Sequence, residues 1–576
     1  MAVNPRGHRL GAVLVAVLLC GCSSASSQRD SATDIDSWTD GLLGDIVGER
    51  QVIDLPASAV DLRLDPYGRT PLAALAIVAV DPQSVQSVSV RLKAEDGADD
   101  LKVDLPYDHD YAERYGCPDL VGDGSVGVPV LGLLAARTNR VIIAVSTADT
   151  VYRLALAIKT ASLHPSLPTI RVVAKDEELM EPGWNLATFM ASENGFKPRP
   201  FIFDNEGRIR WYYRADEAIG LGFTTPIEPL ANGNLLLSLG NLIYQISLLG
   251  REVNRWLLPS GFVQHHDVGQ MPDGGLLVCA EKKATIIPSD GSERTSFQDH
   301  VVELDRQGVV RNIWDLRTFL DIDRYDYMKT GRGDDWFHLN SVIYDQRDDS
   351  IIISGKHQGV AKISRGGANP QDPYRGKTLR WILAAHQGWN TAGFDGGGFD
   401  LRPFLLKAVD AAGEALSTEI QQGTESTPQF GWSYSQHAPV ILPDGTLFLF
   451  DNGWRRDMRQ YEGEPFSRGV VYQITPAGDR VGGTVQQVWE YGRERGAELY
   501  DPVISDVDFG DKTGNYFILP GSYTTQADGT PGGVAKMVEV RPSDKRIVFE
   551  AHIQMSGTAW WGDDMCYRQE RMPLYR

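Results

Sequence analysis

Two kinds of β-hairpin unit alternate along the last two thirds of the chain. The first kind is a turn followed by a strand with an aromatic end, and its six copies end at Trp211, Trp256, Trp314, Trp381, Trp489 and Phe549. The second kind is a turn followed by an apolar strand, as in MPDGGLLVC and LPDGTLFLF. One unit of each kind makes a four-stranded blade, so the alternation predicts a six-bladed β-propeller over residues 176–576.

The chain before the repeats is also rich in strands. Residues 46–175 contain VDLRLD, SVSVRLK and YRLALAIK, short runs that alternate apolar and polar residues and predict a small N-terminal β-sandwich domain. With 576 residues the chain is too long for one ordinary core, which agrees with two predicted domains. Because both domains are predicted to consist of strands, the predicted fold class is all-β, with one exception. The amphipathic run RPFLLKAVDAAGEALSTEI, residues 402–420, predicts a helix in an insertion that either roofs the site or lies on the surface.

The first 45 residues predict export. Arg6 and Arg9 precede an apolar run over 10–19 that is too short to span a bilayer. Small residues before Cys22 indicate a bacterial lipoprotein signal peptide over 1–21, with Cys22 lipidated and 22–45 as a flexible tether; an ordinary secretory signal is the alternative. We expect a periplasmic or cell-surface lipoprotein with a membrane lipid anchor. The absence of Asp at position 23 favours the outer membrane.

The remaining cysteines and the net charge indicate which disulfides, metals and partners can be expected. In an exported chain Cys117 and Cys566, which are predicted to lie in polar loops, can form a disulfide, whereas Cys279 lies in an apolar strand as a buried thiol. No Cys/His spacing typical of a metal site is present. A formal net charge of -20 argues against nucleic acid as a partner, but it leaves room for a local cationic pocket that binds an anion.

Histidines recur at matched positions of the second hairpin unit. His266 lies eight residues before Gly274, His437 lies eight residues before Gly445, and His338 opens its own hairpin at nearly the same place. The inner strands of propeller blades converge on the central channel, so we expect these imidazoles to meet. The hairpin that begins at His338 also carries Asn340 at its start and Lys356 and His357 at its end.

Three uses of such a cluster are open. Three histidines suit a metal ion, but the Lys356 ammonium disfavours a second cation nearby. They can be structural, satisfied by hydrogen bonds in the channel. They can also act in covalent catalysis, with one neutral imidazole as nucleophile while Asn340 and Lys356 bind the oxygens of an anionic group. A non-catalytic surface propeller that binds an anion or a protein partner, and a metal-dependent propeller hydrolase, remain the rival functions.

Four runs carry a resemblance to a known family. DWFHLNSVIYDQRDDSIIISGKHQ, HHD, QHAPV and YRQERM resemble the bacterial arylsulfate sulfotransferases. The resemblance implies a six-bladed propeller enzyme that moves a sulfuryl group from a phenolic sulfate ester to a phenol. It implies no nucleotide sulfate donor, no metal and no other cofactor. It also implies a location outside the cytoplasm, and it suggests a homodimer.

The resemblance also implies roles for individual residues. His437 would be the nucleophile that is transiently sulfurylated in a ping-pong reaction, while His266 and His338 bind sulfuryl oxygens or act as acid and base. Lys356 stands where the family has arginine, so it keeps the charge but lacks the planar fork. Further substrate-binding candidates are Asn340, His357, Ser505, which matches a family hydroxyl, and His265, although the turn alignment favours its neighbour His266.

Overall fold

The computed structural model describes residues 50–93, 101–191, 197–215, 227–286, 294–322, 324, 335–366, 378–392, 398–458, 465–478, 480–521, 524, 533–555 and 564–576. These residues form eight β-sheets, and the described α-helices are the short α2 (His109–Tyr115) and α3 (Thr418–Gln422). The predicted all-β fold class is confirmed. No helix among the described residues is long and apolar enough to cross a membrane.

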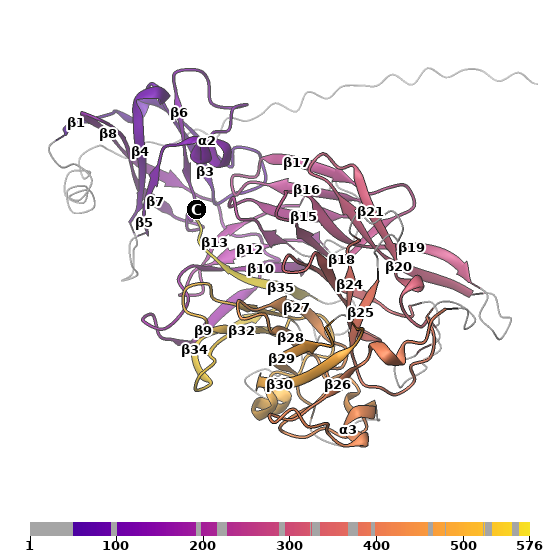
Figure 1. Ribbon diagram of the computed structural model, residues 1–576. Helices are drawn as coiled ribbons and strands as arrows, with labels where there is room; N and C mark the ends of the chain where they lie inside the picture. Colours follow the sequence, from indigo (N-terminus) through magenta and orange to yellow (C-terminus); the bar gives the residue numbers. More distant parts are fainter. Residues whose placement is uncertain are drawn as a thin grey trace, which may run out of the picture.

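Two sheets form a unit at the start of the chain (Figure 1). One has the order β1 (Gln51–Asp54), β8 (Thr150–Lys159), β7 (Thr138–Thr147), β4 (Val85–Leu92) and β5 (Leu101–Pro106). The other has the order β2 (Val60–Leu64), β3 (Ala74–Val78) and β6 (Val126–Val130). Buried side chains of β3 and β6 pack in one cluster with those of β4 and β7, as an N-terminal sandwich requires.

The other six sheets each contain four antiparallel strands in succession, and we call them blades one to six in chain order. Blade one has β35 (Met565–Met572), β10 (Trp184–Ala191), β12 (Phe201–Phe203) and β13 (Ile209–Tyr212), with β11 (Lys197–Pro198) beside β10. Blade two has β14 (Glu228–Pro229), β15 (Leu235–Leu239), β16 (Leu242–Ile246) and β17 (Glu252–Leu257). Blade three has β18 (Val263–Gln270), β19 (Leu276–Ile286), β20 (Arg294–Leu304) and β21 (Val310–Asp315).

Blade four has β22 (Leu339–Asp345), β23 (Ser350–Gly355), β24 (Gly359–Ser364) and β25 (Leu379–Leu383). Blade five has β27 (His437–Ile441), β28 (Leu447–Asp451), β29 (Arg468–Pro476) and β30 (Gly483–Tyr491), with β26 (Leu406–Ala408) parallel to β30. Blade six has β31 (Asp506–Phe509), β32 (Tyr516–Leu519), β33 (Val534–Arg541) and β34 (Arg546–Gln554). A fifth strand, β9 (Thr169–Lys175), pairs with β34.

The first strands of the blades lie next to one another. β18, β22, β27, β31 and β35 each contact the next in that order, as inner strands around a channel would. The six aromatic residues that end the first kind of hairpin unit all lie on fourth strands: β13, β17, β21, β25, β30 and β34. This strand order is the basis for interpreting the repeats as a six-bladed propeller.

Strands from the two sides of the repeat region extend blades one and six. β35, at the C-terminus, pairs with β10 at the start of the repeats, and β9 pairs with β34. β9 lies inside the range 46–175 assigned above to the first domain, so blade six contains strands from both predicted domains. The Tyr575 hydroxyl also accepts a hydrogen bond from the Leu131 amide at 2.7 Å, which ties the C-terminal end to the N-terminal unit.

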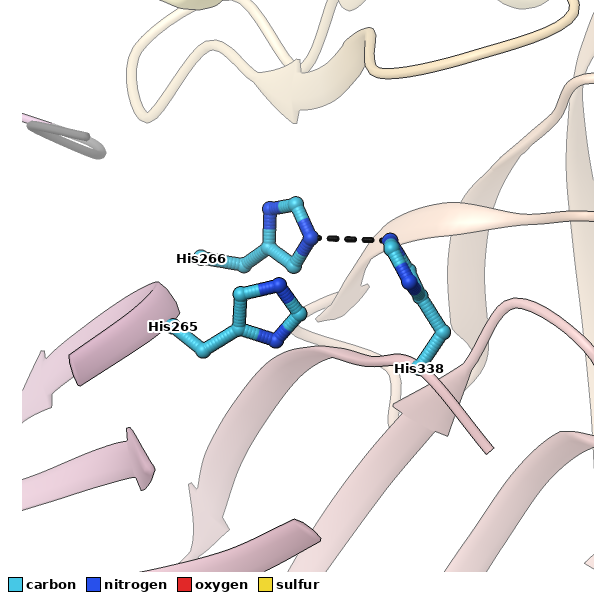
Figure 2. A group of neighbouring side chains, drawn as sticks. All are labelled: His265, His266 and His338. Atoms are coloured by element: carbon cyan, nitrogen blue, oxygen red, sulfur yellow. Dashed lines mark hydrogen bonds between the residues drawn. The ribbon is translucent and has the colours of Figure 1, made fainter. Parts of the chain in front are cut away.

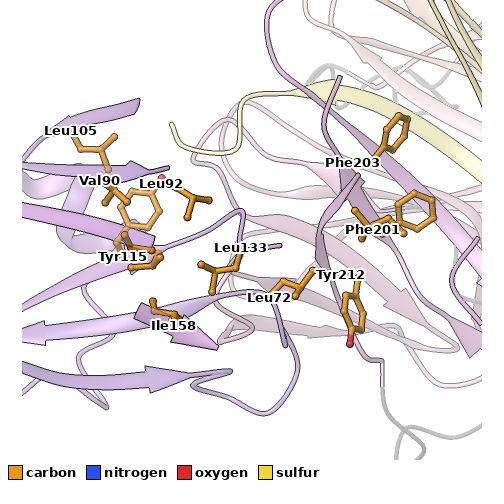
Figure 3. Packing of buried hydrophobic residues seen from close by; sticks show 14 of the residues in the cluster. Leu72, Val90, Leu92, Leu105, Tyr115, Leu133, Ile158, Phe201, Phe203 and Tyr212 are labelled. Carbon is orange, nitrogen blue, oxygen red and sulfur yellow. The ribbon is translucent and has the colours of Figure 1, made fainter. Parts of the chain in front are cut away.

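One apolar cluster joins the N-terminal unit to blade one (Figure 3). Leu72 and Leu133 of the N-terminal unit belong to the same buried cluster as Phe201, Phe203 and Tyr212 of blade one. Burying such side chains stabilises the contact by about 1.5–3 kcal/mol for each large residue. The two parts of the chain are therefore packed together through a shared core.

The helix predicted over residues 402–420 is wrong. The run forms a short 3-10 turn at Arg402–Phe404, the strand β26, a tight turn and only then α3. Asp410 Oδ1 accepts the amides of Ala412 and Glu414 at 2.9 Å, and Gly413 adopts φ +84°, so the turn is built from local side-chain bonds. Strand pairing with β30 and this turn override the apolar periodicity.

The cysteines differ in part from expectation. Cys117, Cys279 and Cys566 are all buried free thiols, so Cys117 and Cys566 form no disulfide in this structure. The polar stretch around Cys566 is not a loop, because Cys566 lies on β35.

Candidate active site

Irregular strand pairing at the beginning of the inner strands determines where the histidine side chains point. The pairing register shifts between Gln264 and Val268 on β18, between Leu339 and Ser341 on β22, and after His437 on β27. His266 and His338 have φ values of +66° and +57°, a region that residues other than glycine seldom occupy. Such strain persists only where the surroundings enforce it, and it is common at functional sites.

Two of the predicted imidazoles are in direct contact. His266 Nε2 and His338 Nε2 lie 2.9 Å apart, and Figure 2 shows the two rings facing each other from β18 and from the start of β22. The Tyr567 hydroxyl of β35 lies 2.5 Å from His266 Nδ1. Blades one, three and four therefore meet at His266.

The hydrogen bonds of these two rings determine where their protons lie. Asp335 Oδ2 lies 2.6 Å from His338 Nδ1, and because a carboxylate only accepts, His338 carries its proton on Nδ1 and its Nε2 is an acceptor. His266 Nε2 therefore donates to His338 Nε2. His266 Nδ1 then accepts from the Tyr567 hydroxyl, which stays protonated because burial raises its pKa. A single chain of donors thus runs from the phenol through two neutral rings to a carboxylate.

Asn452 holds the third imidazole. Its Nδ2 group donates to the carbonyls of Asp501 and Ile504 at 2.8 and 2.9 Å, so its Oδ1 must face His437. His437 Nδ1 lies 2.7 Å from that oxygen and donates to it. The proton of the neutral ring is therefore on Nδ1, and Nε2 keeps its lone pair.

The imidazoles lie in one electrostatic environment. Burial lowers the pKa of His437 to about 3 and that of His265 to about 4, because desolvation penalises the charged ring. Burial also lowers the pKa of His266 and His338 well below the usual value. The Lys356 ammonium lowers the pKa of His266, His338 and His437 further, so the structure brings the predicted lysine and the three histidines together.

The other predicted residues are placed as follows. The His265 ring is 3.9 Å from that of His266 and 5.1 Å from that of His338, so both members of the pair are at the site. The His357 ring lies 5.7 Å from that of His338. Asn340 is buried beneath the site, where its Nδ2 donates to the Gln436 carbonyl at 2.8 Å. Ser505 Oγ accepts from the Gly521 amide and donates to the Val503 carbonyl, both contacts within its own blade.

Two overlapping groups of described residues have the spacing of metal ligands. They are His265, His266 and His338, and Asp335, His338 and His357; within each group the ligand atoms lie within 4.8 Å of one another. Neutral imidazoles are good ligands for zinc or copper. The Lys356 ammonium beside them opposes a divalent cation and favours an anion.

Three contributors were missed from the sequence. Asp335 stands three residues before His338, a signal that was available in the run DDWFH. Asn452 follows β28 just as Lys356 follows β23, so the same reasoning from hairpin ends would have found it. Tyr567 opens the run YRQERM that carries part of the resemblance, but the hairpin pattern gave no signal for its contact with His266, which depends on the pairing of β35 with β10.

The described chain is thus an all-β protein of repeated four-stranded sheets whose inner strands gather neutral imidazoles and an ammonium. The profile of the arylsulfotransferase (ASST) family matches residues 169–568. The chain belongs to this family, which confirms both the resemblance given above and the prediction of an aryl sulfotransferase enzyme.

Two arylsulfate sulfotransferases agree with this assignment. The chain is 26% identical over 571 residues to the arylsulfate sulfotransferase AssT of Escherichia coli O6:H1, covering 85% of this chain and 89% of the relative. It is 25% identical over 575 residues to the AssT of Lelliottia amnigena, with the same coverage. Among solved structures, a β-propeller domain of Cps50 (Swd1) from Myceliophteria thermophila matches 66% of this chain and 99% of its own, with a TM-score of 0.25 and 7% identity.

We predict that stability falls as the medium is acidified below about pH 6.5, the ordinary histidine value. Because the pKa of His437 is lowered to about 3, the unfolded chain binds a proton there that the native chain does not. Replacing His437 by Asn should reduce the slope of unfolding free energy against pH by about 1.4 kcal/mol per unit between about pH 6 and 4. Urea unfolding at several pH values measures the slope.

The control for this experiment is His109→Asn, which alters an exposed histidine on α2. The control should keep the wild-type slope. Equal slopes for His437→Asn and wild type would show that the His437 ring is not held neutral by burial.

Proposed function

We propose that the chain transfers a sulfuryl group from a phenolic sulfate ester to a phenol through a sulfohistidine at His437, with ping-pong kinetics. The observation that carries this proposal is the Asn452 contact, which leaves the His437 Nε2 lone pair available on a neutral, buried ring. A neutral imidazole held in one orientation is a competent nucleophile. Membership of the arylsulfotransferase family supports the reaction class.

In the first half-reaction, His437 Nε2 attacks the sulfur of the aryl sulfate. The N–S bond forms while the bond between sulfur and the aryl oxygen breaks, and the leaving oxygen takes a proton. Sulfuryl transfer resembles phosphoryl transfer, in which positioning and charge stabilisation supply most of the catalysis. The sulfuryl group would lie between His437 and the leaving oxygen in an in-line arrangement.

His338 is the stronger candidate for the general acid. Its Nδ1 donates to the Asp335 carboxylate, which stabilises the ring when it becomes positively charged. His266 lacks this support, because its Nδ1 accepts a hydrogen bond from the neutral Tyr567 phenol. The negative charge of the arriving sulfate ester favours protonation of His338, whose pKa burial otherwise holds low.

Lys356 and His266 would bind the sulfuryl oxygens. The Lys356 ammonium is close enough to depress the pKa of all three imidazoles, so it also favours the negative charge of the transferred group. His266 presents an N–H on Nε2, the atom that now bonds to His338. A sulfuryl oxygen in that position would accept the same proton.

In the second half-reaction a phenol occupies the place of the departed aryl group. Its oxygen attacks the sulfur, its proton passes to His338 Nε2, and the N–S bond to His437 breaks. The enzyme returns to its starting protonation state. The order of events requires release of the first phenol before the second binds, which is the basis for ping-pong kinetics.

We further propose that the protein is an exported lipoprotein, anchored through Cys22 in the periplasm or at the cell surface. The signal sequence over 1–21 supports this proposal, and these residues lie outside the described part of the chain.

We expect His437→Asn to abolish transfer, lowering turnover by at least about 10³-fold, since the residue is the nucleophile. Wild-type enzyme incubated with an aryl sulfate and then digested should yield a peptide containing His437 with the added mass of one SO₃ group. The variant should yield none. Active wild-type enzyme without the adduct, trapped at several times before acceptor is added, would exclude the covalent route.

Asp335→Asn should impair general acid catalysis by His338 and leave the nucleophile His437 in place. General acid catalysis contributes about 10²–10⁴-fold, so turnover of donors with basic leaving phenols should fall by that order. Nitrophenyl sulfate, whose leaving group needs less protonation, should be affected much less. Rates for a series of aryl sulfates measure this dependence.

The matched control is Asp349→Asn, which removes a half-exposed carboxylate from the turn between β22 and β23. It should leave the leaving-group dependence as in wild type. An equal loss for all donors in Asp335→Asn would assign Asp335 a purely structural role.

Cys22→Ser should move the protein from the membrane to the soluble fraction of a Gram-negative host that processes lipoproteins. The thioether and acyl chains form on that sulfur, so serine cannot carry the anchor. Cys20→Ser is the control, and it should remain with the membrane. Retention of Cys22→Ser in the membrane fraction would refute the anchor.

A further inference from the structure

A small cavity of about 40 Å³ lies between blades four and five, and one of the predicted site imidazoles, His357, is in its wall. It is lined by Arg324, Lys356, His357, Gln358, Gly359, Ala384, Ala385, Ser433, Tyr434, Ser435, Gln436, Trp454 and Arg455. Lys356 belongs both to this wall and to the electrostatic environment of the three histidines. Gln436, also in the wall, directly precedes His437. Lys356 and Gln436 thus connect the wall of the cavity to the proposed sulfuryl position.

The wall of this cavity is cationic. It contains the side chains of Lys356, Arg324 and Arg455, and none of the described residues that line it is Asp or Glu. In a protein with a formal net charge of -20, three cationic groups around one small space are a local reversal of the overall charge. Such a space attracts an anion.

Aromatic rings hold two of these cations in place. Lys356 Nζ lies 5.2 Å and Arg455 Cζ 4.3 Å from the centre of the Trp454 ring, distances at which a cation is attracted to the aromatic face. The Arg324 guanidinium stacks at 4.2 Å on Trp389 and donates to the carbonyls of His357 and Ala385. The cationic wall is thus built before any ligand binds.

The size of the cavity selects the kind of anion. A volume of about 40 Å³ is the space of about three water molecules, since one water molecule needs about 10–15 Å³ on the same measure. That space is too small for an aromatic ring. It suits a planar carboxylate, a shape that arginine recognises with two parallel hydrogen bonds.

We propose that this cavity is a subsite for the carboxylate of a phenolic acid, which makes hydroxybenzoate-like phenols preferred acceptors. The proposal rests on the proposed function, because the phenol oxygen must reach the sulfuryl group on His437. With the phenol oxygen at the imidazoles, a ring substituent on the side of Lys356 enters the cavity. Arg455 then faces the carboxylate, while Arg324 adds its positive charge to the wall and keeps its hydrogen bonds to backbone carbonyls.

The experiment compares two acceptors of nearly equal shape, a hydroxybenzoate and the corresponding hydroxybenzamide, which differ by one negative charge. Para and meta isomers of each acceptor are tested. The donor is umbelliferyl sulfate or nitrophenyl sulfate, in which the sulfate group carries the only charge. For at least one isomer, wild-type kcat/KM should be about tenfold higher for the acid than for the amide, as expected for one charge-assisted contact. Arg455→Gln should bring this ratio down to about one.

Two further variants separate a specific contact from a general charge effect. Arg455→Lys keeps the positive charge, so its ratio should lie between those of wild type and Arg455→Gln. Arg541→Gln removes one charge from the outer part of blade six and should leave the ratio unchanged. Thermal unfolding of each variant shows whether it is folded.

Equal use of acid and amide by the wild type, for both isomers, would overturn the subsite. So would an unchanged ratio in a folded Arg455→Gln variant. Transfer to an uncharged phenol is the separate test of the proposed function: its absence in the wild type would overturn sulfuryl transfer itself, whereas its presence without an acid preference would refute only the carboxylate subsite.

Discussion

The pairing of β35 with β10 is the interaction on which the site depends. It completes blade one with a strand from the other end of the chain, and the same strand delivers Tyr567 to His266. The next residue, Arg568, is buried; it donates a hydrogen bond to Asp506 of blade six at 3.0 Å and forms an ion pair with Asp267 of blade three at 3.4 Å. Removing one partner from such a buried set leaves an uncompensated charge and costs about 3–5 kcal/mol. The strand that closes the repeats therefore also aligns the blades that carry the imidazoles.

The imidazoles are held neutral in a strained arrangement. Left-handed backbone at His266 and His338 turns the rings toward each other, at a cost of order 1–3 kcal/mol for each residue. The compensation comes from other blades: Tyr567 bonds His266, and Asp299 of blade three accepts the His338 amide at 3.1 Å. Within blade five, Asn452 fixes His437. The hydrogen bonds that hold the rings also determine which nitrogen of each ring keeps a lone pair, so positioning and reactivity have the same origin.

Repetition explains how much of this could be predicted. The aromatic ends of one hairpin unit identified the fourth strand of every blade, and a shared offset from the turn glycine identified His266 and His437. The apolar periodicity of residues 402–420 predicted a helix wrongly, because strand β26 and a turn at Asp410 form there. The repeat pattern could not predict Tyr567, because its partner lies 301 residues away and only the closing of the repeats brings the two together. Contacts within a repeat can be read from the pattern, whereas contacts between repeats depend on how the blades are packed.

The surroundings of Lys356, where the family resemblance implies an arginine, suit a lysine. A guanidinium at position 356 would offer a planar fork to one anion. The Lys356 ammonium instead lies over Trp454 with Arg455 on the same ring, and its charge still reaches the histidines. A compact point charge can act on two neighbouring anions at once, a sulfuryl group on one side and a substituent in the cavity on the other. In the proposed carboxylate subsite Arg455 supplies the guanidinium, and Lys356 keeps a positive charge beside the histidines.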